Sequence, residues 1–277
     1  MAKLIFGCGY LGRRVAGLWQ QRGDVVYAVT RAATRAESLR REGIRPLIAD
    51  ITAAFPTGER FWPAEIDTVL YAVGYDRGSA ASIHDVYVGG LGKVLDGLTD
   101  SVKRLIYVSS VGVYGDAGGD WVDEEAPCRP IREGGKASLA AEELLKAHRL
   151  GNRAIILRLA GIYGPGRIPR SEALVTAQPI DAPAEGYLNL IHVDDAAAIV
   201  LLAEAKASLP RTYVVSDGQP VVRGDYYREL ARLLAAPAPV FVPPTENTPA
   251  AQRAAGNKRV NNRRLKDELA PKLRYPS

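Results

Sequence analysis

Three glycines near the start of the chain have the spacing of a nucleotide-phosphate loop. They lie in Gly7-Cys8-Gly9-Tyr10-Leu11-Gly12, which fits the pattern G-x-G-x-x-G. The pattern directly follows a strand-like run and opens a helical pattern, which is the context that gives it meaning. We expect Gly7 to permit a tight turn, Gly9 to let a pyrophosphate approach the backbone, and Gly12 to let helix and strand pack closely. We therefore expect Gly7, Gly9, Tyr10, Leu11 and Gly12 to bind a dinucleotide, with the free N–H groups of the helix N-terminus facing its phosphates.

The end of the second expected strand indicates which dinucleotide binds. An NAD site usually has an acidic residue there, which binds the 2′-hydroxyl of the ribose. This chain instead has Val29-Thr30-Arg31-Ala32, with Arg35 nearby and no carboxylate before Glu37. Arg31 can pair with the extra 2′-phosphate of NADP, which favours NADP over NAD. In the alternative interpretation, Arg31 is only an exposed residue at the end of a strand.

The composition is that of an ordinary globular protein. Of 277 residues, 47% are hydrophobic and 24% are charged, so we expect one large domain or one domain with a smaller lobe. The longest apolar runs, such as 196–203, are far shorter than the roughly 20 residues that span a membrane. The two cysteines, Cys8 and Cys128, are too few for a disulfide framework, which favours a reducing cytoplasm.

Metal ions and nucleic acids are not expected as ligands. The three histidines lie far apart in the sequence, so no cluster with the spacing of metal ligands is present. The net charge is +5, but the arginines are scattered along the chain and form no basic stripe. We expect a small-molecule substrate and no membrane partner, and the sequence leaves a homodimer open.

Strand-like runs alternate with helical patterns along the first half of the chain. Strands are expected at 3–6, 25–29, 46–49, 68–72, 105–109, 154–157 and 212–215. Helices are expected at 10–21, 36–42, 87–99, 137–148, 193–207 and 224–234. This alternation predicts an α/β fold with a doubly wound parallel sheet of the Rossmann type. We expect a dinucleotide-binding domain at 1–160, to which 193–215 returns, and a small C-terminal substrate lobe built from 161–192 and 216–277.

Several further motifs follow one another in an order that is typical of one enzyme family. They are Ala49-Asp50-Ile51, Tyr107-Val108-Ser109-Ser110-Val111-Gly112-Val113-Tyr114-Gly115, Leu157-Arg158-Leu159-Ala160-Gly161-Ile162-Tyr163-Gly164-Pro165-Gly166-Arg167 and Ile191-His192-Val193-Asp194-Asp195. Together with the glycine loop, they make the chain resemble the extended short-chain dehydrogenases/reductases of the NAD-dependent epimerase/dehydratase group. The resemblance covers nearly the whole chain.

The resemblance implies roles for individual residues. Asp50 and Ile51 would contact the adenine, Ala72 and Val73 would line the cofactor ribose, and Val108 and Ser109 would lie beside the nicotinamide. Ser110 matches the catalytic serine or threonine of the family, whose hydroxyl hydrogen-bonds the substrate oxygen as its charge changes. In the alternative interpretation, Ser109 and Ser110 only satisfy the backbone at the end of a strand.

The chain departs from the family at the main acid/base pair, a tyrosine followed four residues later by a lysine. None of the thirteen tyrosines has a lysine at that spacing. One alignment of 131–143 puts Gly134 at the tyrosine position and Ser138 at the lysine position, and another puts Arg132 and Lys136 there. The chain therefore resembles an atypical subgroup that keeps the glycine loop and loses the pair.

Substitutes for the missing phenol can be named. Tyr163, Tyr114 and Lys136 are the candidates, in that order, although tyrosines in such loops more often pack and Lys136 can equally be a solvated lysine. Gly161 is a further departure, because the family often has a substrate-binding asparagine there.

Two classes of function follow from these residues. The first is an NAD(P)-dependent epimerase/dehydratase-like oxidoreductase that acts on a nucleotide sugar or a small hydroxyl or carbonyl compound. It would use Ser110 with Tyr163 or Lys136. The alternative is a non-catalytic NAD(P)-binding protein that responds to the cofactor.

Overall fold

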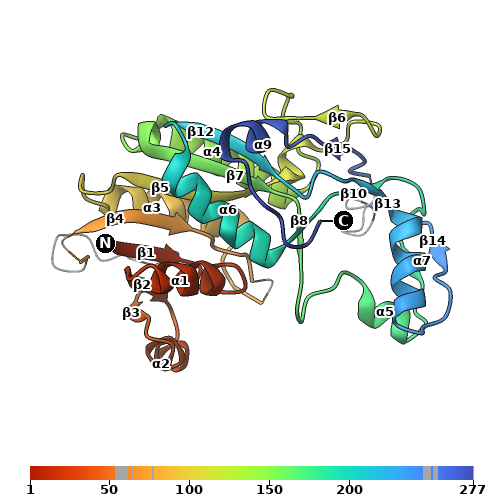
Figure 1. Ribbon diagram of the computed structural model, residues 1–277, viewed down its shortest axis with the longest axis horizontal. Helices are drawn as coiled ribbons and strands as arrows, with labels where there is room; N and C mark the ends of the chain where they lie inside the picture. The colour runs from red at the N-terminus through yellow and green to blue at the C-terminus, as the bar shows by residue number, and fades with distance from the viewer. Residues whose placement is uncertain (54–61, 64, 77, 246–250, 252–254, 277) are drawn as a thin grey trace.

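Seven parallel strands form the central sheet in the computed structural model (Figure 1). The structure describes residues 1–53, 62–63, 65–76, 78–245, 251 and 255–276. The sheet order is β12-β7-β5-β4-β1-β2-β3. Its strands are β1 (Ala2–Phe6), β2 (Val25–Thr30), β3 (Arg45–Ile48), β4 (Ile66–Tyr71), β5 (Arg104–Ser110), β7 (Ala154–Leu159) and β12 (Arg211–Val215). The order changes direction between β1 and β4, which confirms the predicted doubly wound α/β fold.

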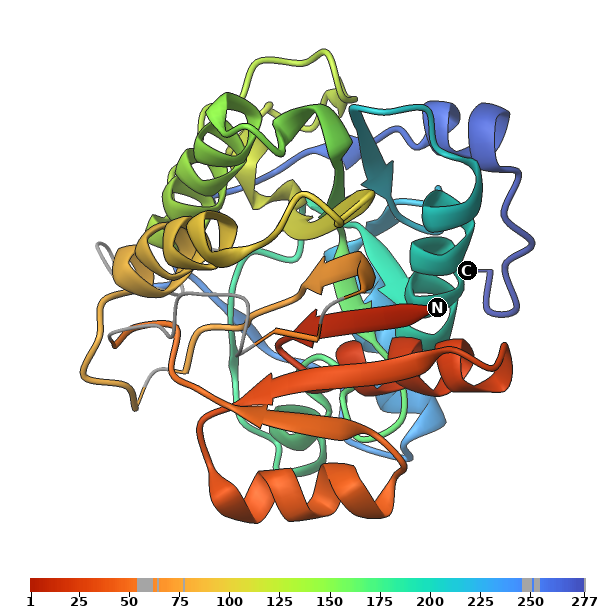
Figure 2. The same cartoon turned by 90° about the vertical axis from the view of Figure 1, so that its left-hand side faces the viewer.

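Helices cover both faces of the sheet, because successive residues of each strand point to opposite sides. Leu4 and Phe6 of β1 pack with α3 (Gly90–Gly97) and α4 (Glu133–Ala147). Ile5, between them, packs with α1 (Gly12–Gln21) and α6 (Val193–Lys206). Figure 2 shows α3 and α4 on one side of the sheet and α1 and α6 on the other. A further helix, α2 (Ala33–Arg41), follows β2.

Four helix starts differ from the sequence expectation by two residues or more. Helix α2 begins at Ala33 instead of at residue 36. Residues 9–11 form the phosphate-loop turn, so α1 begins at Gly12 instead of at residue 10. A π-helical turn, η1 (Asp85–Gly89), precedes α3 within the stretch expected as one helix. Helix α4 begins at Glu133, four residues early, because the low helix propensity of Gly134 and Gly135 hid its first turn.

A small lobe lies beyond the carboxyl ends of the strands, at the right of Figure 1. It contains α5 (Ser171–Val175) and α7 (Arg223–Leu233) and two strand pairs, β9 (Ile180–Asp181) with β14 (Phe241–Val242) and β10 (Tyr187–Leu188) with β13 (Val221–Val222). Leu174, Ile180 and Tyr227 belong to its separate apolar core. A short parallel pair, β8 (Gly161–Tyr163) with β11 (Leu190–His192), joins the lobe to the main domain. None of the helices in the described part of the chain is long and apolar enough to cross a membrane.

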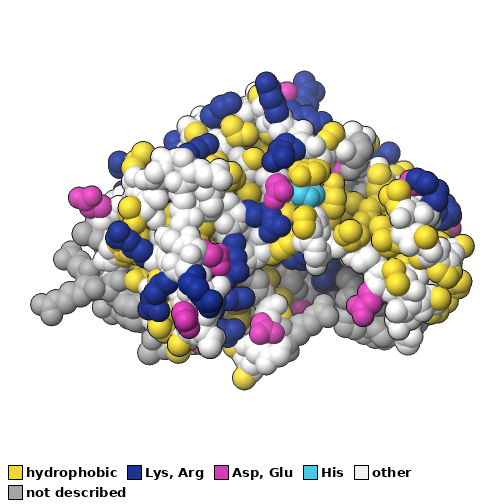
Figure 3. All heavy atoms as spheres, turned by 60° about the horizontal axis from the view of Figure 1, so that its bottom comes forward, with side chains coloured by type: hydrophobic (Ala, Val, Ile, Leu, Met, Phe, Trp, Pro, Cys, Tyr) yellow, Lys and Arg dark blue, Asp and Glu magenta, His cyan; other side chains and the backbone are white. Residues whose placement is uncertain are grey.

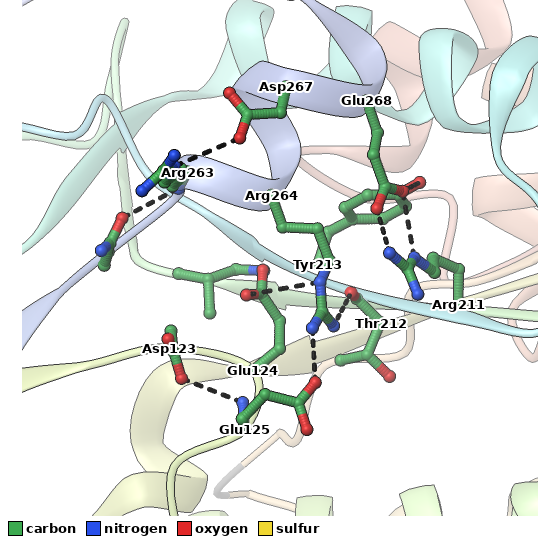
Figure 4. Close-up of polar contacts among 12 residues, drawn as sticks. Asp123, Glu124, Glu125, Arg211, Thr212, Tyr213, Arg263, Arg264, Asp267 and Glu268 are labelled. Carbon is green, nitrogen blue, oxygen red and sulfur yellow. Dashed lines mark hydrogen bonds and ion pairs between the residues drawn. The ribbon is translucent and has the colours of Figure 1, made fainter.

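The C-terminal segment returns from the lobe to the main domain. Strand β15 (Arg259–Val260) pairs with β6 (Trp121–Val122), and α9 (Arg263–Leu269) packs on α6 and β12. Leu265 and Leu269 enter the same core as α1 and α6. In Figure 4, Glu268 of α9 points to Arg211 and Tyr213 of β12, whose hydroxyl lies 2.7 Å from Glu268 Oε2. These contacts hold the C-terminal segment on the main domain. The residues just before β15, in the same segment, enter the cavity described below.

Candidate functional site

A cavity of about 890 Å³ lies at the carboxyl ends of the sheet strands and extends to the lobe. Its lining includes residues after β1, β2, β3, β4, β5 and β7, together with a group from the lobe and the C-terminal segment: Tyr187, Leu188, Asn189, Arg223, Gly256 and Lys258. Figure 3 shows the surface hollowed between the main body and the lobe that carries α7. In doubly wound sheets, ligands bind at this edge of the sheet.

The three glycines of the phosphate loop meet three different physical requirements. Gly7 has φ +85°, and a Cβ there would lie 2.3 Å from the carbonyl oxygen of Ala72. A Cβ at Gly12 would lie 2.5 Å from the carbonyl oxygen of Gly7. Gly9 lines the cavity, and a Cβ there would meet no atom within 4 Å. Gly7 and Gly12 therefore let the backbone pack, while Gly9 keeps space open on the ligand side, as a dinucleotide requires.

Basic residues surround the end of the cavity where the second strand finishes. Arg31 and Arg35 both line it, and Arg31 is exposed while Thr30 is buried. Asp50 and Ile51 lie across from them, after β3. Burial raises the pKa of Asp50, but hydrogen bonds from the Thr52 hydroxyl and N–H outweigh it, so the pKa is lowered overall.

Tyr10, Leu11 and Cys8 also line this part of the cavity. The Tyr10 hydroxyl donates to the carbonyl oxygen of Pro165 at 3.1 Å, which ties the phosphate loop to the loop after β8. Burial raises the pKa of the Cys8 thiol to about 11, so this sulfur is protonated at neutral pH and is a poor nucleophile.

The four residues placed beside the ribose and nicotinamide by the family resemblance all line the cavity. They are Ala72 and Val73 after β4, and Val108 and Ser109 on β5. The Ser109 hydroxyl donates to Glu142 Oε1 of α4 at 2.6 Å. Ser109 is therefore held from behind the site and does not have a free hydroxyl hydrogen.

Ser110 follows directly and also lines the cavity. Its Oγ accepts a hydrogen bond from the Gly112 N–H at 3.0 Å and so caps the single 3-10 turn η2 (Val111–Tyr114). The backbone-capping interpretation is thus part of its role. The same contact leaves the hydroxyl hydrogen free to be donated to a ligand, since the Ser110 oxygen acts there as an acceptor.

A buried ion pair supports this strand end. Arg158 donates to Glu142 Oε2 at 2.7 Å, and both side chains are almost completely buried, at 4% and 0% exposed. Arg158 also donates to the Tyr114 hydroxyl at 2.9 Å. Glu142 thus connects Ser109 on β5, Arg158 on β7 and Tyr114 into one network.

The three residues expected to replace the missing phenol do not line the cavity. Tyr114 is buried in the Arg158 network, and burial raises its pKa above the usual value. Tyr163 packs edge-to-face on His192 at 5.2 Å, and burial raises its pKa as well. Lys136 forms an exposed pair with Glu133 at 2.8 Å, which is the solvated alternative. The structure does not bring these three side chains to Ser110.

The position of Ser138 favours one of the two alignments of α4. Ser138 lines the cavity, whereas Lys136 does not. Its hydroxyl donates to the carbonyl oxygen of Gly134 at 2.8 Å. A Cβ at Gly134 would approach no closer than 3.6 Å to its nearest neighbour, Ile83. Gly134 and Ser138 are the residues that the first alignment places at the tyrosine and lysine positions.

Sequence reasoning missed the residues that reach the cavity from the lobe side. Lys258 is 6% exposed, and its Nζ donates to the carbonyl oxygen of Gly115 at 2.7 Å. The amide of Asn189 holds the same segment, donating to the Lys258 carbonyl at 2.9 Å and accepting from the Val260 N–H at 2.8 Å. Nothing in the sequence sets Lys258 apart, because it lies in a basic stretch more than 100 residues from the motifs after β5.

The Glu142 network generates a stability prediction. Glu142→Ala should lower the free energy of unfolding by about 3–5 kcal/mol, because Arg158 remains buried without its partner. Glu143→Ala is the matched control, since the neighbouring residue on α4 is exposed and should change stability by about 0.5 kcal/mol or less. Urea denaturation of both variants measures the difference. Equal losses in the two variants would contradict the assigned network.

Comparison with known proteins agrees with this geometry. A family model described as "NAD dependent epimerase/dehydratase family" matches residues 4–216. Protein YeeZ of Escherichia coli (strain K12) is 28% identical over 276 residues, which cover 98% of this chain and 95% of that protein.

Two solved structures are similar over almost the whole chain. A functionally unknown conserved protein from Silicibacter pomeroyi DSS has a TM-score of 0.82 and 28% identity, covering 100% of this chain and 94% of that one. MoeE5 in complex with UDP-glucose and NAD has a TM-score of 0.77 and 21% identity, covering 99% and 94%, and shares the fold. Because the family model matches residues 4–216, which make up most of the chain, the chain belongs to the NAD-dependent epimerase/dehydratase family.

Proposed function

We propose that this protein is an NADP-preferring oxidoreductase of the epimerase/dehydratase type, with an atypical proton-transfer site. Its substrate is a nucleotide sugar or a small hydroxyl or carbonyl compound. The observation that carries the proposal is the single cavity that runs from the open face of Gly9, past Ser110, to the lobe. A bound dinucleotide would supply hydride transfer there.

The residues present fit such a dinucleotide. Gly9 leaves a cradle that a side chain would fill, and the N-terminus of α1 faces it. Gly7 to Gly12 would hold the pyrophosphate, Asp50 and Ile51 the adenine, and Ala72 and Val73 the ribose. The NADP preference rests on Arg31 and Arg35, whose guanidinium groups suit a 2′-phosphate.

The size of the cavity supports a substrate beside the cofactor. MoeE5 binds UDP-glucose together with NAD in the same fold. In this chain the lobe side of the cavity carries Arg223 and Lys258, and the Arg167 guanidinium lies over the Tyr10 ring; such groups suit an anionic or oxygen-rich compound.

One observation favours a second candidate, a cofactor-binding protein without catalysis. Gly134 stands where the first alignment expects the phenol, and Tyr114 and Tyr163 point elsewhere. Such a protein would need the glycine loop but no proton donor. Measured turnover separates the two candidates.

The phosphate loop gives the first test of cofactor binding. Gly9→Val should abolish NADPH binding without a loss of stability, because the added side chain fills ligand space and meets no protein atom. Gly7→Val is the contrast and should destabilise the fold itself, since its Cβ overlaps the Ala72 carbonyl. Fluorescence titration and thermal denaturation measure both variants. Wild-type affinity in Gly9→Val would show that the dinucleotide does not use this loop.

Cofactor choice is tested at the end of β2. Wild-type protein should bind NADPH more tightly than NADH, and Arg31→Ala should weaken NADPH binding about 10- to 100-fold while NADH binding changes little. Thr30→Asp should move the preference towards NADH, because an acid there binds the 2′-hydroxyl and repels the phosphate. Arg40→Ala, exposed on α2 outside the cavity, is the control. Equal affinities of the wild type for the two cofactors would contradict the preference.

Catalysis is tested with a panel of nucleotide sugars and small carbonyl compounds, followed by NADPH absorbance. Turnover on ordinary nucleotide sugars should be slow, because the phenol–lysine pair usually contributes about 10²–10⁴ in rate. Ser110→Ala should reduce the remaining rate by about 10²-fold, whereas Ser101→Ala, exposed at the opposite end of the sheet, should not. Tight NADPH binding without turnover of any compound would favour the non-catalytic candidate.

A further inference from the structure

A buried ammonium group enters the substrate side of the cavity from the C-terminal segment. Lys258 lies immediately before β15 and lines the cavity, although its residue is only 6% exposed. In the described part of the chain, its one hydrogen-bond acceptor is the carbonyl oxygen of Gly115 at 2.7 Å. An ammonium group has three donors, so two N–H groups of Lys258 remain for a ligand.

Lys258 and Ser110 lie at opposite ends of the same short turn. Ser110 caps η2 at its start, and Gly115, which holds the Lys258 ammonium, follows its last residue. A 3-10 helix rises about 2 Å per residue, so the five steps from Ser110 to Gly115 separate their backbones by about 10 Å. Both side chains line one cavity, and a sugar-sized group between them could contact each.

Several of the other groups on the cavity wall are less suited to exchange a proton with a substrate. The guanidinium groups of Arg132, Arg167 and Arg223 do not deprotonate in proteins. Tyr71, Tyr87 and Tyr107 have pKa values raised by burial, which keeps these phenols neutral. Cys8 lies within the phosphate loop, on the dinucleotide side.

The charges around Lys258 allow both of its protonation states near neutral pH. Burial lowers the pKa of Lys258, the negative charge of Asp116 raises it and the positive charge of Arg132 lowers it, and together they bring the pKa to about 8. An amine in that range can both give and take a proton at the pH of the cell.

We propose that Lys258 is a catalytic residue that exchanges a proton with a substrate oxygen beside Ser110, in place of the tyrosine–lysine pair that the chain lacks. The inference rests on the oxidoreductase function proposed above. In carbonyl reduction, an N–H bond of the ammonium breaks and an O–H bond forms on the substrate. The carbon accepts a hydride from the reduced dinucleotide, which is oxidised. Lys258 is left as a neutral amine and regains its proton from water, and the reverse reaction runs through the same atoms.

The first experiment measures the amine without any cofactor or substrate. The chain has nine lysines, and the ε-carbons of all of them can be followed by ¹³C NMR during a pH titration of labelled protein. One signal should titrate near pH 8 and be missing from Lys258→Met. A Lys258 signal that titrates above pH 10 would overturn the inference, because the neutral amine would then be too rare.

The second experiment compares variants in NADPH-dependent turnover across the substrate panel. Lys258→Met should lower kcat about 10²- to 10³-fold with little change in KM, and the fall of the carbonyl-reduction rate above pH 8 should disappear. Lys258→Arg keeps a cation and a donor for Gly115 but cannot release a proton, so it should fold and should lose kcat equally. Lys103→Met is the control, since Lys103 is exposed at the start of β5, at the far end of the sheet.

The outcomes separate the two proposals. The role of Lys258 would be overturned if either Lys258 variant kept the wild-type kcat and pH profile, or showed only a rise in KM. The oxidoreductase function would still stand. Failure of wild-type protein to bind NADPH, or to turn over any compound, would overturn both. Full activity in Lys258→Arg alone would show that charge and the Gly115 contact suffice, and would reduce Lys258 to a structural residue.

Discussion

The site depends on one constraint, the close approach of the turn after β1 to the end of β4. The α-carbon of Gly7 packs against the carbonyl of Ala72 so closely that no Cβ fits between them. Gly12 then packs α1 onto the turn, where its own missing Cβ makes room for the Gly7 carbonyl. These contacts aim the N-terminus of α1 at the edge where the strands end. Binding chemistry at that edge follows from backbone geometry before any polar side chain contributes.

Two supports hold the side chains around this edge, one behind the sheet and one in front of it. Behind it, Glu142 joins Ser109, Arg158 and Tyr114 in a buried network. Such a buried ion pair adds little net stability compared with apolar packing. It fixes the positions of its two side chains, because either charge left buried without its partner would cost much folding free energy. In front, Asn189 and the β15–β6 pairing fix the backbone that carries Lys258. The cavity therefore lies between two walls that are each held by hydrogen bonds.

The departure from the family pattern has a simple physical form. One alignment of α4 with the family pattern places Gly134 and Ser138 at the tyrosine and lysine positions, and the Ser138 hydroxyl donates to the Gly134 carbonyl. An ammonium is present in the same cavity, but it arrives from the C-terminal segment. The membership of the family thus fixes the fold and the cofactor class, whereas the proposed proton transfer depends on a residue outside the family motifs.

The sequence by itself determined the parts of this protein whose interactions are local. The apolar runs and their alternation with helices predicted all seven strands of the sheet, and the spacing of Gly7, Gly9 and Gly12 predicted a turn that the structure contains. These features could be predicted because a strand, a turn and the first turn of a helix each depend on residues a few positions apart. Helix starts were less certain, since glycines such as Gly134 weaken the local signal while tertiary packing holds the turn.

Only the tertiary structure decided which polar groups share the cavity. Tyr163 and Tyr114 lie beside family motifs in the sequence, yet packing on His192 and pairing with Arg158 turn them away from the cavity. Lys258 lies far from every motif, yet the pairing of β15 with β6 brings it beside Gly115. Contacts between residues more than 100 positions apart are set by how buried surfaces match, and that information is spread over the whole chain. A motif can therefore locate a binding loop, whereas the group proposed for proton transfer is brought to the cavity only by the fold.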